Sequence, residues 1–318
     1  MSTAEALYTR PRPRLVLSDR AANCLLGAAA AAVIALAILL GLTLSYGAAP
    51  ALSKFGLGFL IGKTWDPVQE EFGALPFIYG TLISSFLALL MAVPVGLGTA
   101  IFLAEVAPPR LARPVAFTVE LLAAVPSVVY GMWGIFVAVP VIARVEEFVG
   151  ARWGHLPLFS GPPIGIGMLA AGLILAIMIL PFVASISREA LLAVPRAQAE
   201  AALALGATKW ETIRGPLLRY ARKGIIGGIV LALGRALGET MAVTMVIGNV
   251  PQISVSLFQS GYTMSAVLAN EFAEATGALH TGALTEIALV LLVLTVAVNA
   301  FARLLIWGTV ARVTGESM

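Results

Sequence analysis

The chain has 318 residues, of which 59% are hydrophobic and 12% are charged, and its mean hydropathy is +0.96. Soluble domains carry roughly twice that charged fraction, so the composition excludes an ordinary soluble protein and predicts an all-α membrane protein. The net charge of +3 is not gathered into an arginine-rich block with interleaved aromatic residues, which argues against a nucleic-acid partner.

Six apolar segments are long enough to cross a bilayer, which takes about 20 mainly apolar residues. They are residues 21–46, 75–103, 115–142, 164–186, 224–250 and 284–310. The first segment follows a polar, basic stretch at residues 1–20 and exceeds the roughly 7–15 residue core of a signal peptide. We therefore expect a cytoplasmic N-terminal tail at 1–20, a permease domain at 21–310 and a C-terminal tail at 311–318.

Lysine and arginine are distributed unevenly between the predicted loops. If the N-terminus lies inside, fifteen of these twenty residues lie on the cytoplasmic side and four outside, and Arg235 lies within a span. Because positive charge accumulates on the cytoplasmic side of membrane proteins, we expect both termini to lie in the cytoplasm.

No motif for catalysis is found in the sequence. Gly62-Lys63-Thr64 resembles the end of a phosphate-binding loop, but that motif needs glycine at the position of Leu57. A single cysteine, Cys24, and two histidines without metal-ligand spacing predict no disulfide, no metal and no cofactor. We therefore expect a chain without catalytic residues that depends on a partner or an ion gradient for energy.

The predicted cytoplasmic loop at residues 187–223 has the signals of two short helices. Pro195 suits the start of the first helix and Gly206 suits its end. Thr208 and Glu211 have the spacing of a capping box, which predicts a second helix that Gly215-Pro216 would end. The loop should form a compact knob that exposes the side chains of Trp210 and Ile213 for a groove on another protein.

The same loop resembles a known family. Glu200-Ala201-Ala202, followed after three residues by Gly206, is similar to the EAA loop of ABC importer permeases. The resemblance implies a type I ABC importer permease fold in which this loop is the coupling helix that docks on a cytoplasmic ATPase, with Trp210 beside it. The family usually has Leu-Pro about a dozen residues after the glycine, whereas this chain has Leu218-Arg219, so the exit from the helix should differ.

Four further segments look like the PstC-type permeases of phosphate importers. They are Phe77–Thr81, Pro126–Gly131, Gly234–Thr240 and Ala269–Glu274. The resemblance implies phosphate as the substrate and the bacterial inner membrane as the location. It also implies a heterodimer with a PstA-type sister permease, PstB-type ATP-binding subunits and a PstS-type extracytoplasmic binding protein. Two alternatives are the same architecture for another oxyanion, such as sulfate or molybdate, and an ion-coupled secondary transporter.

Arg235 and Glu239 place two charges in the predicted fifth span, four residues apart and therefore on one helix face. A charge near mid-membrane costs on the order of 2.5–3.5 kcal/mol, so both should face the bundle interior or a water-filled path. Arg235 either contacts phosphate in passage or pairs, with Glu239 or across the subunit interface, to hold a gate. We prefer the second interpretation, because an unpaired arginine would trap the anion. Glu120, in the predicted third span, faces the same path or lies at the cytoplasmic interface.

Overall fold

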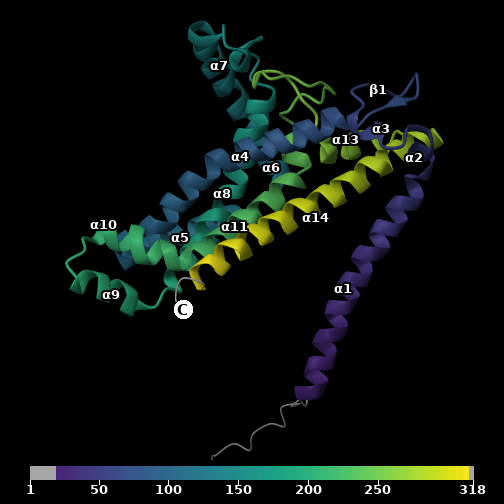
Figure 1. Cartoon of the computed structure of the whole chain (residues 1–318). Helices are drawn as coiled ribbons and strands as arrows, with labels where there is room; N and C mark the ends of the chain where they lie inside the picture. Colours follow the sequence, from purple (N-terminus) through teal and green to yellow (C-terminus); the bar gives the residue numbers. More distant parts are fainter. Residues whose placement is uncertain (1–18, 315–318) are drawn as a thin grey trace, which may run out of the picture.

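The computed structural model describes residues 19–314, and Figure 1 shows their arrangement. The predicted tails therefore lie outside the described residues, except that residues 19–20 extend the first helix and residues 311–314 extend the last. The long helices are α1 (Asp19–Gly47), α4 (Leu75–Ile101), α5 (Pro109–Ala123), α7 (Val139–Trp153), α8 (Met168–Leu192), α11 (Leu218–Leu237) and α14 (Ala278–Thr314).

Shorter elements join them. The short α-helices are α2 (Ala49–Phe55), α3 (Gly58–Ile61), α6 (Ser127–Trp133), α9 (Arg196–Ala204), α10 (Lys209–Thr212), α12 (Met241–Thr244) and α13 (Met264–Glu271). Wider helical turns are η1 (Phe102–Val106), η2 (Gly134–Ala138) and η4 (Ile213–Leu217), and η3 (Pro157–Phe159) is a tighter one. The described strands, β1 (Trp65–Asp66) and β2 (Glu71–Phe72), form an antiparallel hairpin.

The prediction of an all-α membrane protein is confirmed. Within residues 19–314, five helices are long and apolar enough to span a membrane: Ala21–Gly47, Leu75–Val106, Ser127–Trp153, Met168–Leu192 and Ala278–Leu304. Helix α11 is also about 30 Å long, enough to cross the hydrocarbon core. It carries Arg219, Arg222 and Lys223 near its start and Arg235 in its last turn, which explains why composition alone does not select it.

The predicted third span, residues 115–142, is wrong. Helix α5 ends at Ala123, and a new helix begins after Pro126, which forms its N-cap. Proline disfavours helical backbone in the residue before it and fits the start of the next helix. The membrane-crossing helix is therefore Ser127–Trp153, and α5 is a separate helix.

The predicted fifth span, residues 224–250, is also wrong. Helix α11 begins earlier, at Leu218, and ends at Leu237 with Gly238 as its C-cap. The short helix α12 and an irregular segment follow. The fourth span ends later than predicted, because α8 continues through Leu192 and includes residues assigned to the coupling loop.

The core is built around α8, which α4 and α11 flank in Figure 1. Small residues allow this close approach: a methyl group added at Gly228 of α11 would lie 2.9 Å from the Ile186 side chain of α8. Gly224, one turn earlier, lies against Ala190 in the same way. Glycines four residues apart, such as these two, favour close packing of helices in membranes.

Figure 1 separates the two ends of the bundle. Helices α9 and α10 and the end of α14 lie at one end, and α2, α3, β1 and α13 lie at the other. Helix α1 contacts α14 near residues 41–47 and then diverges from the rest of the chain, so most of its apolar side chains are exposed.

Candidate translocation path and coupling segment

Arg235 lies in the last turn of α11, over an aromatic ring of α8. Its guanidinium carbon is 4.6 Å from the centre of the Phe182 ring, which is cation–π range. The Arg235 Nε is buried, and no hydrogen-bond acceptor for it is found among the described residues. A buried donor without an acceptor is costly, and the planar guanidinium suits a tetrahedral oxyanion. The side chain is therefore equipped to bind an anion that enters the bundle.

Glu239 does not share a helix face with Arg235, because α11 has ended before it. Its side-chain Oε1 accepts a hydrogen bond at 3.3 Å from the backbone N–H of Ala242, in the first turn of α12. Its backbone carbonyl accepts one from the Ser265 hydroxyl of α13 at 2.6 Å. No ion pair joins Arg235 to Glu239 in the described part of the chain. The interpretation in which they pair with each other is therefore wrong for this conformation.

Glu120 lies on the exposed side of α5, which is not among the candidate membrane-crossing helices of the described residues. It lines a small crevice together with Arg188 and Ser185 of α8. Arg188 also has a buried Nε without a partner among residues 19–314. The sequence places Arg188 in the cytoplasmic loop, so its position opposite Glu120 was not predicted. Glu120 therefore shares this crevice with Arg188, whereas Arg235 does not line it.

The predicted knob between α8 and α11 is confirmed in its local geometry. Gly206 ends α9 with φ at +88°, a conformation that favours glycine. The capping box of α10 is complete: the Glu211 N–H donates to Thr208 Oγ1 at 3.3 Å, and the Thr208 N–H donates to Glu211 Oε2 at 2.8 Å. The Thr208 N–H and, at 2.7 Å, the Thr208 hydroxyl both donate to the Glu211 carboxylate and hold the pKa of that carboxyl below its ordinary value.

The exposed surface of the knob differs from the prediction at one position. Trp210 is 60% exposed, as predicted, but Ile213 is only 2% exposed and belongs to a buried apolar cluster with Leu191 and Leu217. Gly215-Pro216 does not end the second helix, because the wider turn η4 carries the chain directly into α11. Glu200 and Ala201 are exposed on α9, and Ala202 is half-buried. Leu205, which was not singled out in the sequence, is 89% exposed beside them.

A polar cluster lies at the opposite end of the bundle. Glu271 of α13 accepts a hydrogen bond from the Trp65 indole at 2.9 Å and pairs with His280 of α14 at 3.3 Å. These three residues, with Glu70 and Glu274, line an open hollow of about 570 Å³. The sequence analysis missed the cluster because Trp65 and Glu271 are 206 positions apart.

The candidate membrane helices define an integral membrane protein, and the sequence assigns it to a family of transport components. Residues 92–306 match the family described as binding-protein-dependent transport system inner membrane component, and the chain belongs to that family.

Among named relatives, the chain is 49% identical over 290 residues to the phosphate transport system permease protein PstC of Mesorhizobium japonicum, covering 89% of each chain. It is 49% identical to the PstC of Pasteurella multocida over 83% of this chain and 84% of that one. A probable PstC of Methanocaldococcus jannaschii is 38% identical over 80% of this chain and 82% of the relative. The resemblance to PstC-type permeases is thereby confirmed.

A solved structure supports the fold. The chain resembles the inward-facing methionine ABC transporter MetNI with a TM-score of 0.56 and 19% identity, covering 77% of this chain and 99% of that one. At this identity the likeness concerns the fold alone, and it confirms the predicted ABC importer permease fold.

Proposed function

We propose that this chain is the transmembrane permease subunit of an ATP-driven importer of inorganic phosphate and forms half of the translocation pathway. The observation that carries the proposal is the 46–49% identity to permeases named PstC over most of both chains. The unpartnered guanidinium donor of Arg235 in the bundle is consistent with an anionic substrate.

The partners follow from the same proposal. A PstA-type sister permease completes the pathway, and PstB-type subunits hydrolyse ATP, so this chain itself catalyses no reaction. The PstB-type subunit docks on the knob through Trp210, Leu205 and the α9 surface around Glu200. A PstS-type binding protein delivers phosphate at the opposite end, near the hollow of Glu271 and His280. The assembly lies in the bacterial cytoplasmic membrane, with the tails at residues 1–20 and 311–318 in the cytoplasm.

The mechanism is alternating access, with Arg235 as the contact for phosphate in passage. The Phe182 ring, 4.6 Å from the guanidinium carbon, supplies no hydrogen-bond acceptor, so it leaves the N–H donors of Arg235 unpaired. A cation–π contact neutralises the charge less than a carboxylate would, and it leaves room for the anion. Glu239 orients the α12–α13 segment beside it through its two hydrogen bonds. Arg188 and Glu120 form a second polar position farther along α8.

The test is uptake of labelled phosphate into proteoliposomes that contain this chain with its sister permease, ATPase and binding protein. ATP-dependent uptake that excess sulfate and molybdate do not reduce is the expected result. Competition by sulfate or molybdate would assign the pathway to another oxyanion. Uptake that continues without the ATPase subunit would refute ATP coupling and favour an ion-coupled transporter.

A further inference from the structure

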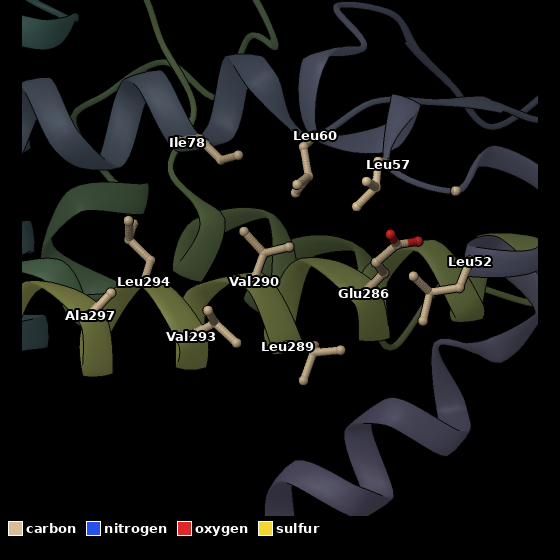
Figure 2. A pocket seen from close by; sticks show the side chains of 11 residues that line it. Leu52, Leu57, Leu60, Ile78, Glu286, Leu289, Val290, Val293, Leu294 and Ala297 are labelled. Atoms are coloured by element: carbon tan, nitrogen blue, oxygen red, sulfur yellow. The ribbon is translucent and has the colours of Figure 1, made fainter.

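A buried carboxyl group lies in an apolar groove that the transport mechanism does not use. Glu286 of α14 is 3% exposed, and its Oε2 has no hydrogen-bond partner in the described part of the chain. Figure 2 shows its oxygen atoms directed into the groove, toward Leu57 and Leu60. An unpaired carboxyl in an apolar wall is unfavourable, and such groups in membrane segments are retained for a partner or a function.

The groove itself is formed by α14 on one side and by α2, α3 and the start of α4 on the other. It measures about 420 Å³, within the roughly 300–1,000 Å³ of small-molecule sites. Apart from Glu286 and Gly56, its lining consists of aliphatic side chains, as Figure 2 shows. Leu57 and Val293 on its rim are 83% and 58% exposed. The groove is therefore open toward the surroundings and accepts an apolar occupant.

The shape of the groove selects a long, thin occupant. Its lining on α14 runs from Glu286 to Ala297, about 16 Å along the helix axis, with the carboxyl at one end. Glu286 lies eight residues after α14 begins, about 12 Å from the end of the bundle that carries the β1–β2 hairpin. A polar head at Glu286 and an apolar tail toward Ala297 would match this layout and the direction of a lipid in the nearer leaflet.

We propose that the groove binds one phospholipid that carries a primary ammonium head group. One acyl chain occupies the aliphatic part of the groove, and the ammonium donates a charge-assisted hydrogen bond to the Glu286 carboxylate. A primary ammonium has three N–H donors, a quaternary choline ammonium has none, and an anionic glycerol head group would be repelled. Glu286 therefore selects among head groups, while the aliphatic wall binds the acyl chain without selection.

The experiment is native mass spectrometry of the full chain in detergent with one dioleoyl lipid added at a time. The lipids are phosphatidylethanolamine, phosphatidylcholine and phosphatidylglycerol. We expect one tightly retained phosphatidylethanolamine per chain, bound about tenfold more tightly than phosphatidylcholine, because a charge-assisted hydrogen bond is worth about that factor. Glu286→Gln keeps the size of the side chain and should remove this preference. Glu71→Gln, an exposed carboxylate on β2 outside the groove, should leave the preference unchanged.

A second variant tests the groove apart from the carboxyl. Val293→Trp fills the open rim at an exposed position that tolerates a large side chain, and it should reduce retention of all three lipids. Equal retention of phosphatidylethanolamine by the unmodified chain and by Glu286→Gln would overturn the proposal. So would equal binding of phosphatidylcholine and phosphatidylethanolamine. The same measurement on the assembled transporter should give the same retention, whereas loss of the lipid there would overturn the proposal and assign the groove to a helix of another subunit.

Discussion

Replacing Trp210 by alanine tests whether the knob is the contact with the ATPase. The side chain is 60% exposed, so of the roughly 250 Å² that a tryptophan can bury, about 150 Å² remains for a partner. At about 25 cal/mol per Å² the upper limit is about 4 kcal/mol, and aromatic interface residues commonly contribute 2 kcal/mol or more. We therefore expect the Kd for the ATPase subunit to rise between about 30-fold and 1,000-fold.

The assay is titration of the ATPase subunit onto the detergent-solubilised permease pair, followed by ATP-driven phosphate uptake in proteoliposomes. Trp153→Ala is the matched control, because Trp153 is also exposed, at 43%, but ends α7 far from the knob in sequence. The control should leave the Kd unchanged. A Trp210→Ala variant that binds the ATPase within threefold of the unmodified chain would refute the assignment of the knob as the docking surface.

Three further perturbations follow from the structure. Arg235→Ala should abolish phosphate uptake at normal expression. Arg235→Lys should restore only part of the uptake, because lysine lacks the planar fork of N–H donors with which arginine binds an oxyanion. Normal uptake by the alanine variant would contradict the role of Arg235 as the contact for phosphate. Thr208→Ala should destabilise α10 by about 1 kcal/mol, measured as faster hydrogen exchange of the residue 209–212 amides. Thr208→Ala also removes the hydrogen bond from the Thr208 hydroxyl to the Glu211 carboxylate, whose folded-state pKa is lowered. That part of the difference is complete above the ordinary glutamate pKa and is lost as the pH falls through the lowered pKa, whereas the bond from the Glu211 N–H to Thr208 Oγ1 persists, so the gap in exchange rate between the two chains should narrow in acid. Gly80→Ala would place a methyl group against the Tyr262 carbonyl oxygen and should cost about 1–3 kcal/mol, seen as a lower Tm of the purified protein; an unchanged Tm would show that the two segments can separate freely.

Much of the fold could be predicted because a helix that crosses the lipid bilayer must be long and mainly apolar. Uncharged runs of sufficient length mark most of the membrane-crossing helices, and local hydrogen-bonding preferences mark the knob at Gly206, Thr208 and Glu211. Both signals are short-range, so they can be read from neighbouring residues.

The errors arise where backbone and side-chain positions depend on distant contacts. The run from residue 224 to 250 stays mainly apolar although α11 ends at Leu237, because hydropathy does not register a change of backbone direction. The prediction that Arg235 and Glu239 lie on one helix face was wrong for the same reason. Ile213 was predicted to be exposed, but it is buried in an apolar cluster that includes Leu191 of α8 and Ala100 of α4, and no local pattern encodes such a cluster.

Helices α10 and α11 are joined without a break through η4, so a movement of the knob can be transmitted along α11 to its far end. One end of α11 adjoins the knob, and the other end, about 30 Å away, carries Arg235. If α11 moves as a stiff rod, a tilt of about 10° imposed at the knob shifts Arg235 by about 5 Å, the rise of a single helical turn. Pro216 lies in η4, at the knob end of α11. There the chain lacks the regular α-helical hydrogen bonds that would resist a change in the tilt of α11. A small closing movement of a partner bound to the knob is therefore enough to move the Arg235 guanidinium by about the width of a phosphate ion.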